Sequence, residues 1–153
     1  MTKSPSDVLV RPVTPADRQT WEHLFLDYGV FYEEDFPQPV IDGVWQWLMD
    51  STHPVRCFVA EIEGTVIGFA HLRHQHDTFT AGPGWFLDDL FTSPEARGRG
   101  AATALINSAN EYALAHGGGT LRWITAHDND RARRLYDTLA TPTTWVTYEK
   151  EVE

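Results

Sequence analysis

The sequence contains a single cysteine, and it has neither a long apolar run nor an apolar N-terminal segment. Because Cys57 has no second cysteine to pair with, an internal disulfide is excluded. Residues 1–7 are polar and lack the apolar core of a secretory signal. No apolar stretch approaches the ~20 residues of a membrane span. We therefore expect a protein of the reducing cytoplasm, without a membrane partner.

Positive charge is scarce as well. Against 22 Asp and Glu there are only 12 Lys and Arg, which gives a formal net charge of -10. Phosphate backbones are bound by basic faces, so we expect no nucleic-acid partner. An acidic protein attracts cationic small molecules or basic peptides instead. The 153 residues, 42% of them hydrophobic, suit one domain over 1–153 with a sizeable core.

Hydrophobic periodicity and turn residues divide the chain into short elements. Thr14 reads as an N-cap with Pro15 at the first helical position, and Glu63-Gly64 reads as a tight hairpin turn. Antiparallel strands come first and a β-α-β crossover follows, which predicts an α/β fold with a mixed sheet and helices on both faces. We expect strands at 8–13, 57–62, 65–72, 85–92, 121–126 and 145–151, helices from 15, at 40–48, 98–116 and 129–139, and a turn at 81–84.

The segment 93–102, between a strand and a long helix, is suited to hold an anion. The first turn of a helix has free backbone N–H groups and the positive end of the helix dipole. Gly98 and Gly100 allow close approach to that backbone, and Arg97 and Arg99 add positive charge. We interpret the segment as a phosphate-binding loop.

Three other readings of this loop remain open. A P-loop lacks support, because the segment has no GxxxxGK[ST] pattern and no lysine. A dinucleotide fingerprint is closer, but Thr103 stands where glycine or alanine is expected, and a Rossmann half needs more β-α units than the remaining chain provides. The third reading is that the loop is an ordinary Gly-rich connection that binds no ligand.

The chain resembles the GCN5-related N-acetyltransferases, the GNAT superfamily. The [Q/R]-x-x-G-x-[G/A] signature of that family is matched by residues 97–102. Residues 87–91, Leu-Asp-Asp-Leu-Phe, are similar to the Leu-Glu-Asp strand of the spermidine/spermine and histone/polyamine acetyltransferase branch. Asn129, Ala132 and Leu135-Tyr136 match its N-x-x-A-x-x-[L/F]-Y helix, and residues 10–17 and 66–70 also look typical.

The resemblance implies a GNAT fold with a central β-α-β core that binds acetyl-CoA, and no metal. It implies that backbone amides of the signature bind the pyrophosphate and that the preceding strand pairs with the pantetheine arm. One N–H of that strand would polarise the thioester carbonyl. The implied cofactor residues are Leu90, Phe91, Thr92, Arg97, Gly98, Arg99, Gly100, Ala101, Ala102, Asn129 and Arg133; for Arg133, a solvated helix face is an open alternative.

The resemblance also implies two catalytic residues. Tyr136 stands at the position of the usual general acid, which protonates the departing thiolate. Asp88 stands where polyamine-type relatives have a glutamate base. Because successive strand residues point to opposite faces, we expect Asp88 to face the substrate and Asp89 to point away. An aspartate is shorter than glutamate, which favours a water relay.

The acceptor is an amine, and acetyl transfer would be direct, in a ternary complex. Glu33 and Glu34 lie in the segment that lines the acceptor pocket of the family and would attract a cationic amine; a solvated acidic loop is the alternative. A polyamine-like acceptor is favoured, with a protein or peptide amine and an inactive acyl-CoA sensor as alternatives. A homodimer is possible, since relatives are often dimers.

Histidines and the lone cysteine suggest other chemistry only weakly. His74 and His76 share one strand face and His71 lies on the other, with no cysteine nearby, so we expect no metal site. His127 is an alternative base. Cys57 lies in a strand without an evident base, which argues against a covalent cysteine route.

Overall fold

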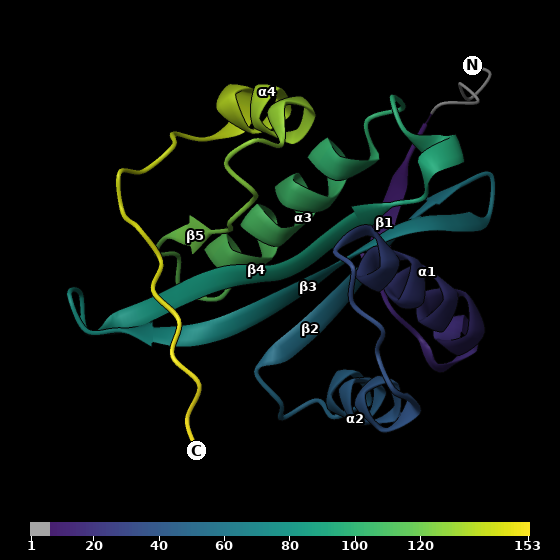
Figure 1. Cartoon of the computed structure of the whole chain (residues 1–153), viewed down its shortest axis with the longest axis horizontal. Coiled ribbons are helices and arrows are strands. Elements are labelled where there is room, and N and C mark those ends of the chain that lie inside the picture. The colour runs from purple at the N-terminus through teal and green to yellow at the C-terminus, as the bar shows by residue number, and fades with distance from the viewer. Residues whose placement is uncertain (1–6) are drawn as a thin grey trace.

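The computed structural model describes residues 7–153, which form a five-stranded sheet with helices on both faces (Figure 1). The polar residues 1–6, in which we expect no export signal, lie outside the described part. The strands are β1 (Leu9–Pro12), β2 (Val55–Ile62), β3 (Thr65–Asp77), β4 (Gly82–Thr92) and β5 (Leu121–Arg122), and the helices are α1 (Arg18–Phe31), α2 (Gln38–Met49), α3 (Ala101–Ala115) and α4 (Asp130–Leu139), with short 3-10 turns at Pro15–Asp17 and Pro94–Ala96.

The sheet has the predicted mixed topology. Its strands are ordered β1-β2-β3-β4-β5, antiparallel throughout except for the parallel pair β4 and β5. The turn between β2 and β3 is confirmed at Glu63 and Gly64, both with positive φ as a tight hairpin turn requires. Thr14 does cap the first helical turn, in which Pro15 takes the first position.

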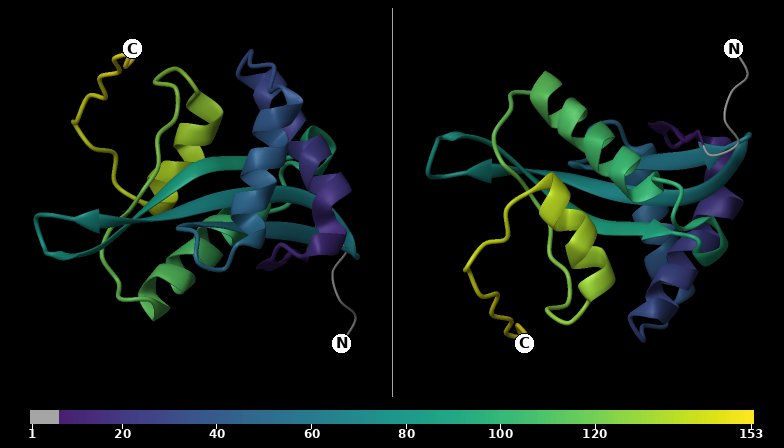
Figure 2. Two further views of the ribbon diagram at one scale, coloured as in Figure 1. Left: turned by 90° about the horizontal axis from the view of Figure 1, so that it is seen from below. Right: turned by 90° about the horizontal axis from the view of Figure 1, so that it is seen from above.

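Two cores lie on opposite faces of the sheet. On one face α1 and α2 pack over β-strand side chains such as Phe69 and Phe91. On the other face α3 packs over Leu72 and Leu87, with Tyr136 and Leu139 of α4 at its margin. Seen from below, α1 and α2 lie in front of the sheet; seen from above, α3 and α4 do (Figure 2). Strand residues thus alternate between two buried faces, as the apolar strands predicted.

The ends of several elements differ from the sequence predictions. The hairpin of β3 and β4 is longer than expected: β3 runs to Asp77, β4 begins at Gly82, and the turn lies at 78–81 instead of 81–84. The fifth strand stops at Arg122, not 126. The predicted last strand at 145–151 is not formed, because this segment has no neighbouring strand to pair with and lies exposed.

None of the helices within residues 7–153 is long and apolar enough to cross a bilayer. Cys57 is buried in the core under α1 and α2, and burial raises the pKa of its thiol. The nucleophilic thiolate is therefore disfavoured at this position.

Candidate active site

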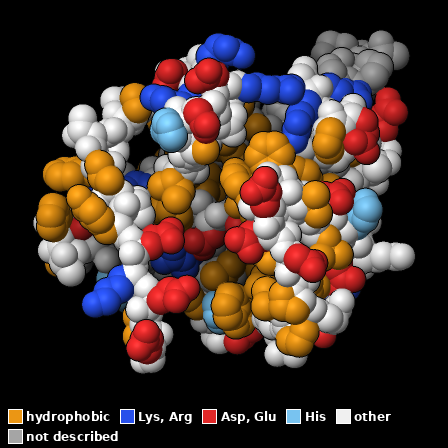
Figure 3. Space-filling model, viewed as in Figure 1, with side chains coloured by type: hydrophobic (Ala, Val, Ile, Leu, Met, Phe, Trp, Pro, Cys, Tyr) orange, Lys and Arg blue, Asp and Glu red, His pale blue; other side chains and the backbone are white. Residues whose placement is uncertain are grey.

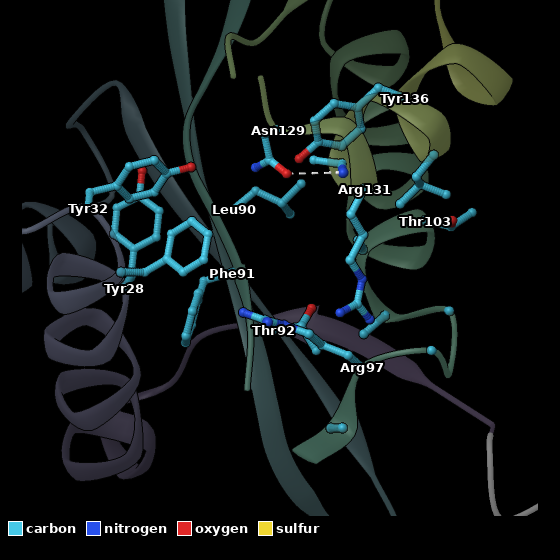
Figure 4. Close-up of a pocket in the computed structure, with 18 residues that line it drawn as sticks. Tyr28, Tyr32, Leu90, Phe91, Thr92, Arg97, Thr103, Asn129, Arg131 and Tyr136 are labelled. Carbon is cyan, nitrogen blue, oxygen red and sulfur yellow. Dashed lines mark hydrogen bonds between the residues drawn. The ribbon is translucent and has the colours of Figure 1, made fainter. Parts of the chain in front are cut away.

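A cavity of about 560 Å³ opens where β4 and β5 diverge. The two strands pair only at Trp85 and Phe86 of β4, so the rest of β4 presents an open backbone edge. Helix α1 borders this edge on one face, and the start of α3 and helix α4 border it on the other (Figure 4). The lining residues are Tyr28, Phe31, Tyr32, Leu90, Phe91, Thr92, Ala96, Arg97, Gly98, Gly100, Ala101, Ala102, Thr103, Asn129, Arg131, Ala132, Leu135 and Tyr136.

One end of the cavity is the N-terminus of α3. Gly98 and Gly100 adopt φ values of 80° and 86°, a left-handed conformation that side chains disfavour. Gly100 is the N-cap residue, and its carbonyl accepts the first helical hydrogen bond, from Ala104 at 3.0 Å. The N–H groups of residues 101–103 precede that bond and have no acceptor within the helix. This geometry is suited to an anion, which is the role that the loop sequence predicts.

Two arginines add positive charge at this end. Arg97, from the loop, and Arg131, from the first turn of α4, both line the cavity. Arg131 extends from α4 toward the start of α3, whereas Arg97 extends toward α1 (Figure 4). The Arg97 guanidinium also lies 5.7 Å from the ring centre of Phe31, so it bridges the loop and α1. Arg99 and Arg133 do not line the cavity; Arg133 donates a hydrogen bond to the His127 carbonyl at 2.7 Å instead.

The middle of the cavity is formed by the open edge of β4. Leu90, Phe91 and Thr92 line it, as the resemblance implied. The hydroxyl of Thr92 is buried and has no hydrogen-bond partner among the described residues. A buried polar atom without a partner is costly and indicates that a bound group completes the site. An extended arm with amide groups fits both this hydroxyl and the unpaired strand edge.

Asn129 and Tyr136 enter the cavity from the α4 side. The Asn129 side-chain oxygen caps α4 by accepting a hydrogen bond from the Ala132 N–H at 3.3 Å. Its NH₂ group therefore stays available to the cavity. Tyr136 packs edge-on against Trp123, with ring centres 5.5 Å apart, and its hydroxyl points toward the side chain of Asn129 (Figure 4).

Burial raises the pKa of Tyr136 to about 12. The phenol is thus fully protonated near neutral pH, as a proton donor must be. A free thiol has a pKa near ~8.5, so complete transfer of the proton to a thiolate is uphill by roughly 5 kcal/mol. Tyr136 is therefore suited to stabilise a leaving thiolate by donating a hydrogen bond.

The other end of the cavity is formed by aromatic residues of α1. Tyr28, Phe31 and Tyr32 all line it, and the two tyrosines project toward β4 (Figure 4). Burial raises the pKa of both Tyr28 and Tyr32. Glu33 and Glu34 are exposed in the turn after α1 and do not line the cavity. Phe31 and Tyr32, which directly precede these two glutamates, line the cavity where we expected Glu33 and Glu34.

The two aspartates of β4 face the same side of the sheet, not opposite sides as we expected. Asp88 accepts two hydrogen bonds from Arg73, both at 2.9 Å, and Asp89 contacts His71 at 2.7 Å. His71 and Arg73 are two residues apart on β3 and therefore share a face. The register of β3 and β4 shifts between His71 and Leu72, leaving Asp88 as an extra residue of β4. This β-bulge turns both carboxylates to the α1 side.

Asp89 is the end of a buried chain of hydrogen bonds. The Trp21 indole N–H donates to Nε2 of His71 at 3.0 Å. Because indole nitrogen is only a donor, His71 carries its proton on Nδ1 and donates it to Asp89. On its other side Asp89 lies near Tyr28, whose phenol has a pKa that is raised first by burial and then by the charge of Asp89. Neither aspartate lines the cavity itself, but Tyr28 does.

The charged side chains form two groups on this face. Lys and Arg side chains lie over α4 and the loop before α3, at the top of Figure 3, with acidic side chains among them, and a further acidic group lies near the centre. His74 and His76 share a face, with rings 5.4 Å apart, whereas His71 is buried on the other face as predicted. Within residues 7–153 no cluster of three metal-ligating side chains occurs.

Sequence reasoning missed several residues of the cavity. Tyr28 lies one helical turn before Phe31 and Tyr32, and this spacing of aromatic residues at the end of α1 is the sequence signal that could have identified them. Arg131 was overlooked in favour of Arg133, although both are on the first turns of α4. Nothing in the sequence distinguishes their directions. Ala96, Thr103, Ala132 and Leu135 complete the lining.

The comparisons with known proteins assign the family. The family model "Acetyltransferase (GNAT) family" matches residues 18–140, which include all the elements that line the cavity. The chain belongs to this GNAT acetyltransferase family. It is an acetyl-CoA-dependent N-acetyltransferase. The cavity fits the co-substrate, because it combines an anion site, an open strand edge and an unpaired buried hydroxyl. Acetyl-CoA supplies the thioester carbonyl that an amine attacks and the thiolate that leaves.

Two relatives cover most of the chain. The D-amino-acid N-acetyltransferase HPA3 of Saccharomyces cerevisiae is 27% identical over 146 residues, which span 94% of this chain and 90% of the relative. The uncharacterized N-acetyltransferase YhfO of Bacillus subtilis is 29% identical over 128 residues, or 84% of this chain and 85% of the relative. Neither name refers to polyamines, so the polyamine branch is not established by these relatives.

Solved structures share the fold. The aminoglycoside N-acetyltransferase AAC(6')-Iy in complex with CoA has a TM-score of 0.82 at 21% identity, covering 95% of each chain. Ribosomal-protein-alanine N-acetyltransferase from Brucella melitensis has a TM-score of 0.79 at 19% identity, covering 95% of this chain and 99% of that chain. The expected GNAT fold is thereby confirmed. Small-molecule and protein acetyltransferases both occur among these neighbours.

Proposed function

We propose that this GNAT enzyme acetylates the primary amine of a small cationic molecule, by direct transfer in a ternary complex. The observation that supports the proposal is one continuous cavity, with the start of α3 at one end and Tyr28 and Tyr32 at the other. Beyond the strand edge and the helix N-terminus that we assign to the donor, the cavity of about 560 Å³ continues to the α1 tyrosines, where we place the acceptor. The net charge of -10 attracts cations.

The acceptor amine needs a group that takes its proton. An alkyl ammonium has a pKa near ~10, so it must be deprotonated before it attacks a thioester. The sequence favoured Asp88, and the resemblance supports it. Asp88, however, is held by Arg73 through both carboxylate oxygens, and an amine would have to displace that ion pair. Asp89 is a better candidate, because its carboxylate is near Tyr28, which lines the cavity, and it has no arginine partner among the described residues.

In this mechanism each residue has a distinct task. Asp89 receives the proton of the amine, through the Tyr28 hydroxyl or a water molecule. His71, fixed as the Nδ1–H form by Trp21, keeps the Asp89 carboxylate oriented. Tyr136 donates a hydrogen bond to the leaving sulfur. Asn129 and the N-terminus of α3 position the donor through its amide and phosphate groups.

Release of CoA thiol with a panel of amines tests the proposed acceptor. The panel contains spermidine, a D-amino acid, an aminoglycoside and a lysine peptide. We expect spermidine and the aminoglycoside to give the highest kcat/KM. The D-amino acid is the informative rival, because a relative is named for that activity. Preference for the D-amino acid or the peptide would contradict the cationic proposal. CoA binding without thiol release on any amine would indicate a sensor.

The proposed base is tested by pH dependence. Asp89→Asn should lower kcat/KM by about 100-fold near neutral pH, at the low end for loss of a general base. The defect should shrink as the pH approaches the pKa of the amine, since the acceptor then deprotonates without help. Asp88→Asn is the matched control and should have a smaller, pH-independent effect. A larger and pH-dependent defect in Asp88→Asn would support the original assignment. Acetyl-CoA affinity should be unchanged in both.

A further inference from the structure

A second hollow, which we call the histidine groove, lies on the α3 face of the sheet. It has a volume of about 350 Å³, and small-molecule sites range over roughly 300–1,000 Å³. Its lining residues are Thr52, His53, Pro54, Arg56, His74, Trp85, Tyr112 and His116. None of them lines the acetyl-CoA cavity, so both sites can be occupied at the same time.

The charge of the histidine groove is opposite to that of the protein as a whole. The chain has 22 Asp and Glu, yet no carboxylate lines the groove, whose ionisable groups are Arg56, Tyr112 and three histidines. Asp50 lies outside this lining. Hydrogen bonds from Thr52 first, and then the charges of His53 and Arg56, lower the pKa of Asp50. The groove is therefore a local basic site that favours an anion.

Arg56 has donors left for such an anion. One N–H of its guanidinium donates to the carbonyl of Ser51, which holds the side chain in place without neutralising its charge. Within residues 7–153 no carboxylate forms an ion pair with it. A guanidinium has five N–H donors in a planar fork, which matches a carboxylate or a phosphate. His53 adds a donor, because its Nδ1 accepts the Val55 N–H at 3.1 Å and its proton is therefore on Nε2.

The walls of the groove are planar rings. Trp85 is only 3% exposed, and its indole N–H donates to the carbonyl of Gly118 at 2.8 Å, which fixes the ring. The Tyr112 ring meets Trp85 edge-on with centres 5.8 Å apart, and the His74 ring lies 5.0 Å from it. His116 stacks on Tyr112 with ring centres 3.9 Å apart. Rings that are already packed offer a rigid surface on which a flat ligand can stack.

We propose that the histidine groove binds a small planar anion, an aromatic ring that carries a carboxylate or a phosphate. Arg56 and His53 hold the anionic group, and the ring lies against Tyr112 and His116. The histidines do not form a metal site, since no three metal-ligating side chains converge within residues 7–153. A nucleic-acid strand is disfavoured by the net charge of -10.

Calorimetric titration of the full chain with phenyl phosphate tests the proposal. One molar equivalent of CoA is added first, which fills the acetyl-CoA cavity and leaves no excess for the groove. We expect a Kd below about 1 mM. Inorganic phosphate lacks the ring and phenol lacks the charge, so each should bind at least about tenfold more weakly. AMP and indole-3-acetate then distinguish the two sources of the anionic group, because the tighter of them identifies a phosphate or a carboxylate.

Nitrogen–proton NMR spectra locate the bound probe. The indole N–H resonance of Trp85 should shift when phenyl phosphate is added, whereas that of Trp21, in the core on the opposite face of the sheet, should not. Arg56→Gln should weaken phenyl phosphate binding by at least about tenfold, because it removes a charge-assisted contact. Arg134→Gln is the matched control: it removes the same charge from an exposed position on α4 that lines neither site, and should have no effect.

His116→Ala tests the stacking separately. His116 is exposed, so its loss leaves the core intact. This variant should weaken phenyl phosphate several-fold and leave inorganic phosphate unchanged. The proposal is overturned if phenyl phosphate does not bind up to about 5 mM, or if inorganic phosphate binds as tightly. It is also overturned if Arg56→Gln and Arg134→Gln lose equal affinity, or if the Trp85 resonance does not move while the probe binds.

Discussion

The two ends of the cavity are built from different parts of the chain. The proposed donor end is built from backbone: the N–H groups at the start of α3, the two left-handed glycines and the open edge of β4. The proposed acceptor end is built from side chains: Tyr28 and Tyr32 of α1 line it, and the aspartates of β4 lie behind that lining. Backbone geometry requires only a short spacing of glycines, so a motif can identify it. A pocket of side chains depends on the exact packing of three elements.

This difference accounts for what the relatives share and what they do not. Proteins with only 19–21% identity to this chain have the same fold, including one solved with CoA. Their names nevertheless refer to different acceptors, from an aminoglycoside to a ribosomal protein. A donor site made of backbone tolerates such sequence change, whereas an acceptor site made of side chains changes with it.

The largest effect is expected from a charge placed in the backbone-built end. Gly100→Asp should lower CoA affinity by more than about 100-fold, because a carboxylate at the helix N-terminus occupies the anion site and repels phosphate. A Cβ at Gly100 meets no atom within 4 Å, so the fold has room for the side chain. Calorimetric titration with CoA measures the loss.

Gly64→Asp is the control for this variant. Gly64 has nearly the same φ, 82° against 86°, and the same open surroundings, but it lies in the β2–β3 turn. Both variants should lose a similar stability, about 1–2 kcal/mol for a side chain in the left-handed region. Only Gly100→Asp should lose CoA. Wild-type CoA affinity in that variant would show that the glycine loop is not the phosphate site.

The next effect concerns Tyr136, which connects the two ends. Tyr136→Phe should lower the single-turnover rate by on the order of 100-fold, because the leaving sulfur loses its hydrogen-bond donor. Acetyl-CoA affinity should change only a few-fold, since the ring still packs on Trp123. Tyr112→Phe, on α3 and outside the cavity, should be silent. If both variants turned over at the wild-type rate, Tyr136 would be a packing residue only.

Sequence reasoning predicted the fold well where local signals and pairing partners agree. The β2–β3 hairpin, the mixed sheet and the start of α3 follow from turn residues, alternation and glycine spacing. The strand predicted at 145–151 was wrong because strand propensity does not supply a neighbour. The prediction that Asp88 and Asp89 point to opposite faces of the sheet was also wrong. A single extra residue in β4 reverses the alternation of side chains, and no residue type marks that bulge.

The residues predicted for the candidate site also fall into a correct and an incorrect group. Gly98, Gly100, Ala101, Ala102, Asn129 and Tyr136 were named from motifs, and all line the cavity. Glu33, Glu34 and Arg133 were chosen for their charge, and none of them does. Charge alone does not determine the direction of a long or exposed side chain, whereas a glycine pattern constrains the backbone itself.

A moderate effect distinguishes two arginines of α4. Arg131→Ala should weaken CoA binding by about tenfold, because Arg131 reaches the anion site and one charge-assisted hydrogen bond at a solvated position has roughly that value. Arg133→Ala removes the same charge two residues away and should have almost no effect. Equal losses would mean that the net charge of α4, and not a specific contact, assists binding.

The smallest expected effect is the pH dependence of the contribution that Tyr136 makes to the rate, which should be absent. Burial raises the pKa of Tyr136 to about 12, so its phenol remains protonated as the pH rises from about 7 to about 10. The ratio of wild-type to Tyr136→Phe single-turnover rates should therefore not change over this range. With an unshifted pKa near ~10, half of the phenol would be ionised at pH ~10, and the rate advantage would be halved. Taking the ratio cancels the ionisation of the acceptor, which affects both enzymes alike. A ratio that falls about twofold by pH ~10 would mean that Tyr136 is solvated in the working complex, and that the donor end does not exclude water around the leaving sulfur.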